Sequence, residues 1–131
     1  TIKIDKNKIR LYGIDAPEKK QQCQKMWLSI SFLTLNKNYQ CGKISSNKLK
    51  VKINNKFIMC KSSNKDRYNR FIAECYKDKI NINKWMVSNG YAVAYKKYSK
   101  KFVAQENIAK KEKLGLWAGT FEMPWEWRKK N

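Results

Sequence analysis

Apolar and polar residues alternate near the start of the chain, and this period of two predicts short β-strands. Ile2 and Ile4 alternate with polar residues, which is typical of a half-buried strand. The segment Ile9–Ile14 repeats the alternation and predicts a second strand. Because the polar stretch 5–8 between them is typical of a turn, the two strands are expected to pair antiparallel.

The second strand is expected to end at Ala-Pro, because Pro17 has no N–H for a strand ladder and keeps the residue before it extended. Arg10 then lies on the strand, Asp15 at its end and Glu18 just beyond a rigid corner. One guanidinium and two carboxylates at a strand end indicate a metal-assisted phosphate site. The alternative is a strand that leads into an ordinary surface turn.

The middle of the chain predicts one helix and two strands. Residues 18–39 are polar at first and apolar later, and are interpreted as a helix or a loop packed on the core. Gly42–Lys52 predicts a short helix. Lys56–Lys61 and Phe71–Tyr76 predict two strands that flank a polar loop at 62–70.

The C-terminal half predicts two further helices. Ile82–Asn89 ends at a glycine and predicts the first, and Lys100–Lys113 predicts the second. Residues 91–95 form a short apolar segment between them, and the tryptophans in 117–127 are interpreted as packing anchors rather than base-stacking platforms. Strands followed by helices in 131 residues predict a single α+β domain over residues 1–131.

Charge narrows the class of partner. Thirty Lys and Arg residues against ten Asp and Glu residues give a formal net charge of +20. A surface this positive attracts polyanions, with nucleic acid first and an anionic membrane surface second. Arginine occurs only at Arg10, Arg67, Arg70 and Arg128. Where lysine is the usual cation, an arginine marks a position where a planar bidentate group is useful, and chance placement is the alternative.

Four cysteines and no histidine limit the possible chemistry. Without histidine or a CxxC pair, a zinc site and a histidine-dependent triad are not expected. Four cysteines in a small basic domain predict disulfides and an oxidising compartment, with three possible pairings. We favour Cys23–Cys41, which closes the segment between them, and Cys60–Cys75, which joins adjacent strands. The alternative for Cys60 and Cys75 is two buried free thiols.

Four blocks of sequence, in order along nearly the whole chain, resemble the staphylococcal nuclease (thermonuclease) family. They are Ile9–Glu18, Asp66–Arg70, Trp85–Ala92 and Ala109–Trp117. One block alone is weak evidence, whereas four in the same order are strong. The resemblance implies an OB-fold-like barrel of five strands with about three α-helices. It also implies calcium-dependent hydrolysis of DNA and RNA, by a secreted or periplasmic protein.

The same resemblance implies roles for individual residues. Arg10, Glu18 and Arg70 match the two arginines and the glutamate that are catalytic in the family. Asp15 matches a calcium-binding aspartate, and Ala16 matches the residue that offers its backbone carbonyl to the ion. Calcium (Ca²⁺) is therefore the expected cofactor.

Two tyrosines also match the family pattern, and at two places the chain differs from it. Tyr68 and Tyr95 match residues that line the nucleotide site. Thr1 resembles the last residue of an Asp-Gly-Asp-Thr turn, so a second calcium-binding aspartate and the first strand of the barrel would precede residue 1. Asn69 replaces a usual glycine, and is expected to be harmless because Asn tolerates a left-handed turn. The cysteines resemble those of exported members, where similar positions are paired.

The resulting hypothesis is a monomeric, sugar-non-specific nuclease without a membrane span, in which Glu18 is the candidate general base. Arg10 and Arg70 would clamp the phosphate, and the lysines would hold the strand without reading its bases. The alternative is an OB-type module that binds nucleic acid without cutting it. A third class, a cationic protein on anionic membranes, explains the charge but not the carboxylates, and lacks the basic amphipathic helix of that mode.

Overall fold

A computed structural model describes residues 1–131, apart from the side chain of Trp27. Its largest sheet has the strand order β1-β2-β7-β6, with β8 added beside β7. β1 and β2 are antiparallel, β2 and β7 are parallel, and β7 is antiparallel to both β6 and β8. The bounds of these strands are Ile2–Ile4 (β1), Asn7–Leu11 (β2), Met59–Lys65 (β6), Phe71–Lys77 (β7) and Ile80–Asn81 (β8).

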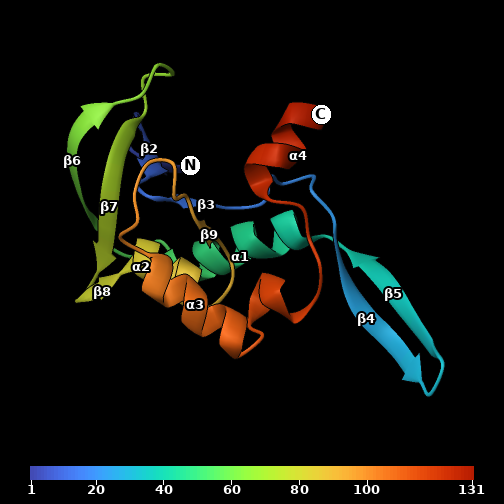
Figure 1. Ribbon diagram of the computed structural model, residues 1–131. Helices are drawn as coiled ribbons and strands as arrows, with labels where there is room; N and C mark the ends of the chain where they lie inside the picture. Colours follow the sequence, from blue (N-terminus) through green and yellow to red (C-terminus); the bar gives the residue numbers. More distant parts are fainter.

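Two smaller two-stranded sheets accompany the main one. β3 (Ile14–Asp15) pairs antiparallel with β9 (Val93–Ala94), directly after the turn that ends β2. β4 (Cys23–Ile30) and β5 (Leu33–Tyr39) form a long antiparallel hairpin that projects from the rest of the molecule (Figure 1). The described strands therefore form three sheets rather than one closed barrel.

The helices gather between the main sheet and the hairpin, except for the last one (Figure 1). α4 stands apart at the C-terminal end of the chain, near the segment that follows β3. None of the helices in the described part of the chain combines the length and apolar character needed to cross a bilayer. Their bounds are Cys41–Ile53 (α1), Ile82–Ser88 (α2), Val103–Lys111 (α3), Gly115–Ala118 (the 3₁₀ helix η1) and Pro124–Lys130 (α4).

The main core forms where the sheet packs on α2. Ile9 and Leu11 on β2 are buried, whereas Arg10 between them stays partly exposed, as a strand with one buried face requires. Ile82 and Val87 of α2 are fully buried in the same cluster. Burial of these side chains fixes the position of β2 and hence of the arginine that it carries.

Several predictions from the sequence are confirmed. The antiparallel pair of strands at the N-terminus is present, and the three predicted helices appear as α1, α2 and α3 with ends shifted by up to three residues. Both favoured disulfides, Cys23–Cys41 and Cys60–Cys75, are formed, and they account for all the cysteines among the described residues. The α+β class is confirmed, whereas the closed five-stranded barrel is not, and the structure has four α-helices rather than about three.

Three local predictions were wrong. Residues 18–39 were interpreted as a helix or a loop, but residues 23–39 of this stretch form the β4–β5 hairpin, in which a register shift between Met26 and Leu28 interrupts the alternation that would have marked a strand. The predicted strand Ile9–Ile14 is divided at Gly13, whose φ of 72° turns the chain. The loop predicted at 62–70 is shorter, because β6 continues to Lys65.

Candidate functional site

The site is built around Asp15, which ends β3. The turn at Gly13 separates β3 from β2, so β3 pairs with β9 instead, and Asp15 lies opposite Val93. The backbone N–H of Tyr95 donates to the Gly13 carbonyl at 2.9 Å and continues this pairing. As a result the Asp15 side chain is only 4% exposed, although its carboxylate keeps charged partners.

Glu18 follows Pro17, and hydrogen bonds to Gln21 hold its main chain in place. Its N–H donates to the side-chain oxygen of Gln21 at 3.3 Å, and its carbonyl accepts from the Gln21 N–H at 2.7 Å. Gly42 at the start of α1 packs directly on it, since a Cβ at residue 42 would lie 1.7 Å from the Glu18 carbonyl oxygen. The side chain of Glu18 is 44% exposed and so remains available to a ligand.

Gln21 connects this segment to the start of the last helix. Its side chain is fully buried and its Nε2 donates to the Glu122 carbonyl at 2.8 Å. Glu122 lies two residues before α4 begins. One buried amide therefore fixes both the main chain of Glu18 and the approach to α4.

Arg128 of α4 is bound to both carboxylates. Its Nη2 donates to Asp15 Oδ2 at 2.6 Å, and its Nη1 donates to Asp15 Oδ1 and to Glu18 Oε1, each at 3.0 Å. Two parallel bonds to one carboxylate are the strong, geometrically specific form of an arginine–carboxylate pair. The hydrogen bond to Asp15 is the largest cause that raises the pKa of the Arg128 guanidinium above its ordinary value.

Arg10 reaches the same aspartate from β2. Its Nη2 lies 3.4 Å from Asp15 Oδ1, and its Nη1 donates to the Leu11 carbonyl at 3.2 Å. Burial lowers the pKa of the Arg10 guanidinium, Asp15 opposes that shift, and Arg70 and Arg128 add to it. Arg10 and Arg128 therefore both contact Asp15, whereas Arg70, an electrostatic neighbour of Arg10, is paired with Asp66.

Arg70 is oriented by the β6–β7 turn. Asp66 Oδ2 accepts from the Nε of Arg70 at 2.8 Å, and Asp66 Oδ1 accepts from the backbone N–H groups of Tyr68 and Arg70. Asn69 has φ 62°, the left-handed conformation that its side chain was expected to tolerate. The Nη1 of Arg70 donates to the hydroxyl of Thr1 at 3.0 Å, so the guanidinium points toward the N-terminal strands.

The remaining predicted residues lie around this cluster. Ala16 is half-buried between Asp15 and Pro17. The Tyr68 side chain is 63% exposed, and the Arg70 guanidinium lies 5.5 Å from its ring centre.

The ring of Tyr95 stacks on Trp125 at the start of α4, with ring centres 4.9 Å apart. It is also an electrostatic neighbour of Arg10. The fold therefore brings the predicted site residues into one region.

Arg128 was missed as a site residue by the sequence analysis. The only signal was its presence as one of four arginines in a lysine-rich chain. Its role depends on α4, which the sequence analysis did not predict.

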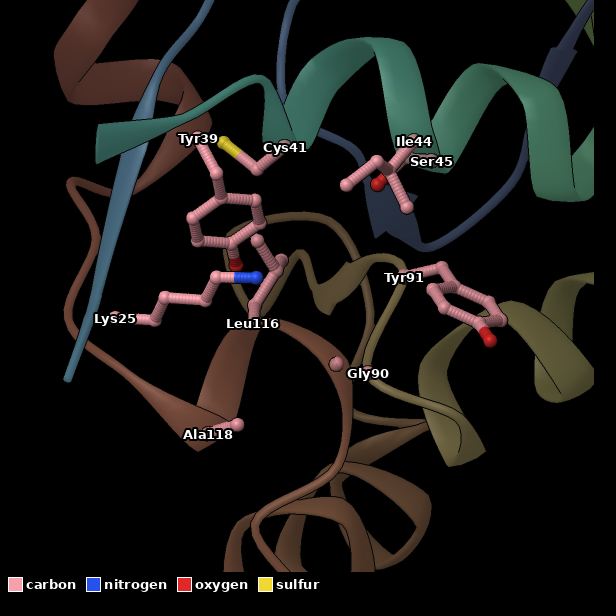
Figure 2. Close-up of a pocket in the computed structure, with 10 residues that line it drawn as sticks. Lys25, Tyr39, Cys41, Ile44, Ser45, Gly90, Tyr91, Leu116 and Ala118 are labelled. Atoms are coloured by element: carbon pink, nitrogen blue, oxygen red, sulfur yellow. The ribbon is translucent and has the colours of Figure 1, made fainter. Parts of the chain in front are cut away.

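The arginine–carboxylate cluster is distinct from the pocket shown in Figure 2. That pocket has a volume of about 240 Å³ and lies between the base of the β4–β5 hairpin, α1 and η1. Lys25, Tyr39, Tyr91 and Leu116 line it together with the disulfide residue Cys41, and none of the predicted catalytic, metal-binding or nucleotide-binding residues does. Its walls carry no carboxylate, so it offers no chemistry for phosphate hydrolysis.

Comparisons with known proteins define the family. Residues 8–119 match the family described as staphylococcal nuclease homologue. An uncharacterized endonuclease of Haemophilus influenzae is 38% identical over 127 residues, which cover 93% of this chain and 60% of that protein. An uncharacterized endonuclease of Escherichia coli O157:H7 is 32% identical over 125 residues, which cover 92% of this chain and 70% of that protein. The chain therefore belongs to the staphylococcal nuclease family.

A plant relative extends the comparison. A probable staphylococcal-like nuclease of Oryza sativa subsp. japonica, CAN4, is 33% identical over 127 residues, which cover 95% of this chain. Those residues are 22% of the rice protein, so the chain corresponds to one part of that relative. The chain likewise spans only part of the Haemophilus and Escherichia proteins.

Proposed function

We propose that this protein is a nuclease that hydrolyses phosphodiester bonds of DNA and RNA. The observation that carries the proposal is the cluster of Arg10, Asp15 and Glu18 in a chain that belongs to a nuclease family. A phosphodiester is negatively charged and gains charge on its oxygens during hydrolysis. Fixed guanidinium groups around the reacting phosphate stabilise that charge.

Arg10 and Arg70, which match the two catalytic arginines of the family, are held in place by different contacts. Arg10 sits on a buried strand and is held by Asp15 and the Leu11 carbonyl. Arg70 is aimed by Asp66 across the β6–β7 turn. We propose that both donate to non-bridging phosphate oxygens, with the planar geometry that suits bidentate contact.

Glu18 is the proposed general base. Its carboxylate is partly exposed and its main chain is fixed by Gln21. The chain has no histidine, so a carboxylate is the remaining type of base beside the arginines. In this role Glu18 accepts the proton of the attacking water.

Calcium is the proposed cofactor, and the two carboxylates of the cluster support it. Asp15 and Glu18 already converge on one cation, the guanidinium of Arg128, and hard oxygen donors are calcium ligands. The described residues contain no group of three or more His, Cys, Asp or Glu side chains suited to a metal. Asp15 and the carbonyl of Ala16 would hold the ion, and Arg128 would have to release Asp15. When bound, calcium would neutralise a phosphate oxygen and help to orient water.

Binding of the nucleic acid strand is proposed to involve Tyr68, Tyr95 and the lysines. An exposed tyrosine ring offers a face on which a base can stack without regard to sequence, and Tyr68 is exposed beside Arg70. The net charge of +20 supports contacts with many phosphates, which gives affinity that falls steeply with salt.

Location and assembly are part of the proposal. Two disulfides support a secreted or periplasmic protein, since such bonds persist in oxidising compartments. The high positive charge of each copy supports a monomer. We also propose a barrel of the OB type, in which a further strand pairs with β1 at the open edge of the main sheet.

A non-catalytic module that binds nucleic acid is the second candidate. One observation favours it: Arg128 binds both Asp15 oxygens and Glu18, so the carboxylates are neutralised without metal. The same positive region would then hold phosphate without cutting it.

Digestion of single-stranded DNA, with calcium and with EDTA, separates these candidates. The substitution Glu18→Gln should lower the cleavage rate by about 10²- to 10⁴-fold while DNA binding stays nearly unchanged. Glu112→Gln, on the exposed C-terminal end of α3, is the control and should keep the full rate. The assay is run on this chain and on a chain extended upstream, because the sequence analysis places a second metal-binding aspartate before residue 1.

Three results are possible. Calcium-dependent cleavage that Glu18→Gln abolishes supports the nuclease. DNA binding without cleavage in both lengths of chain supports the binding module. Joint loss of cleavage and binding in Glu18→Gln would show that Glu18 is structural.

A further inference from the structure

The β4–β5 hairpin carries a set of apolar side chains that contact little of the protein. The hairpin extends away from the sheets and helices (Figure 1). Phe32 at its tip is 89% exposed. The other exposed apolar residues on it are Met26, Leu28, Ile30, Leu33 and Leu35. Apolar side chains grouped in this way mark a surface for a partner.

Strand register places four of these residues on one face. Leu28 is paired with Leu35, and Ile30 with Leu33. Because side chains alternate along a strand, both pairs point to the same side. The pair between them, Ser29 and Thr34, points to the other side, where the two hydroxyl oxygens are 3.4 Å apart. The distal half of the hairpin is therefore amphipathic.

Two lysines follow the apolar pairs toward the base of the hairpin. Lys37 lies two residues beyond Leu35 and thus on the same face of β5, and Lys25 is its partner on β4. Tyr39 comes next on that face, and the Nζ of Lys25 lies 5.2 Å from the centre of its ring. Figure 2 shows Lys25 and Tyr39 together at this base. The face thus changes from aliphatic to cationic and aromatic along its length.

The base of the hairpin is firmly attached to the body. Cys23 at the start of β4 is bonded to Cys41 at the start of α1. Gln24 exchanges two backbone hydrogen bonds with Thr120, at 2.9 and 2.8 Å. An isolated two-stranded hairpin is only marginally stable in water, so these links hold the arm in a defined position.

We propose that this hairpin inserts its apolar end into the surface of an anionic lipid bilayer. The apolar part, from the Leu28–Leu35 pair to the turn, is about 10 Å long at roughly 3.3 Å per strand residue plus the turn, and elements at a membrane interface bury their apolar groups to about 5–10 Å. Lys25 and Lys37 then lie at the level of the lipid phosphates, where lysine side chains extend toward the headgroups. The hairpin is thus an amphipathic element of another kind than the basic helix that the sequence analysis found to be lacking.

The charge and the aliphatic side chains together favour an anionic bilayer over a second copy of the chain and over nucleic acid. A second copy of the chain carries the same charge of +20 and is repelled, whereas an anionic bilayer is attracted. Nucleic acid would satisfy the charge but would not bury the branched aliphatic side chains, because these do not stack on bases. The combination of an aliphatic end and a cationic base fits a lipid surface.

Sedimentation with lipid vesicles tests the proposal. One set of vesicles contains phosphatidylcholine and phosphatidylglycerol in equal parts, and the other contains phosphatidylcholine alone. Phe32→Ser should weaken binding to the anionic vesicles by about tenfold, which corresponds to the loss of one buried aromatic side chain. Phe57→Ser is the matched control, because Phe57 is 90% exposed but lies outside the hairpin.

A second variant and a second measurement make the test specific. Lys25→Gln with Lys37→Gln should also weaken binding to the anionic vesicles, while thermal unfolding stays close to that of the original protein. Equal losses for Phe32→Ser and Phe57→Ser would overturn the proposal and assign binding to general charge. A dimer that sedimentation equilibrium detects and Phe32→Ser abolishes would overturn it in favour of self-association. These readouts do not depend on nuclease activity.

Discussion

Arg128 and Asp15 form a two-bond ion pair between residues that are 113 positions apart in the sequence. The same guanidinium also contacts Glu18, so one side chain of α4 joins both carboxylates of the candidate site. A cation that binds Asp15 must therefore compete with Arg128. This contact makes the C-terminal helix part of the site rather than a separate packing element.

Removal of the Arg128 guanidinium is expected to tighten calcium binding. Arg128→Gln frees Asp15 Oδ2 and leaves Oδ1 with Arg10 alone, and the calcium dissociation constant should fall by roughly tenfold, because the pair is charge-assisted but only partly shielded from solvent. Isothermal titration calorimetry measures the constant directly and independently of cleavage.

One control variant accompanies Arg128→Gln. Lys129→Gln removes a positive charge from the same helix but not from the carboxylates, since Lys129 pairs with Glu126. It should leave the calcium constant nearly unchanged. Unaltered calcium affinity in Arg128→Gln would show that Arg128 and calcium do not share Asp15.

Loss of the Gln21 amide is expected to disturb both sides of the site. Gln21→Met keeps the apolar part of the side chain but removes its bonds to the Glu18 N–H and the Glu122 carbonyl. Because the side chain is fully buried, the free energy of unfolding should fall by about 1–3 kcal/mol. The cleavage rate should fall by about tenfold or more as Glu18 loses its position.

The adjacent Gln22 provides the control for that substitution. Gln22 is exposed, so Gln22→Met should change neither the urea unfolding curve nor the initial rate of DNA cleavage. If Gln21→Met matched Gln22→Met in both measurements, the buried amide would not position the site.

Asp66 is expected to act through Arg70. In the folded protein one oxygen of Asp66 accepts from the Arg70 side chain and the other accepts from the turn backbone. Asp66→Asn replaces one of these two oxygens by an NH₂ group, which cannot accept a hydrogen bond. The cleavage rate should fall by about ten- to a hundredfold, because the guanidinium of Arg70 is no longer aimed. Steady-state kinetics on a short DNA substrate measure the change.

Asp78→Asn is the matched control for Asp66→Asn. Asp78 lies in the exposed turn between β7 and β8 and, like Asn69, has a positive φ. Its substitution should leave the cleavage rate unchanged. A full rate in Asp66→Asn would mean that Arg70 keeps its orientation without the carboxylate.

The ion pair between Glu74 and Lys101 predicts a pH dependence of stability. Burial raises the pKa of the Glu74 carboxyl, but hydrogen bonds from Lys101 and Asn81 outweigh it and hold that pKa below its usual range. A carboxyl with a lowered pKa in the folded state stabilises the protein above its unfolded pKa, and this stabilisation is lost as pH falls through the folded pKa.

Urea unfolding of the original protein and of Glu74→Gln at several pH values tests this dependence. The difference in free energy of unfolding should be largest near neutral pH, at less than about 1 kcal/mol because Lys101 is half exposed. It should shrink below about pH 4. It should also shrink in alkali, as pH rises through the raised pKa of Lys101. A difference that stays constant with pH would contradict the ion pair.

Local patterns in the sequence were enough for several parts of the fold. The first two strands alternate clearly, and α2 was predicted from the glycine that follows its end. The arrangement of Asp15 and Glu18 at a strand end also followed from Pro17 alone. The hairpin at 23–39 did not, because a register shift interrupts its alternation and its two-residue turn lacks glycine.

The sequence by itself determined the family and the α+β class, favoured the two disulfide pairs that are formed, and named Arg10 and Glu18 as site residues together with Asp15. These depend on residue types and on patterns that are local in the chain. Only the tertiary structure decided that β2 runs parallel to β7, that the hairpin stands free, and that Arg128 covers the carboxylates. The physical reason is that such contacts join residues far apart in sequence, and the path of the folded chain alone brings those charges together.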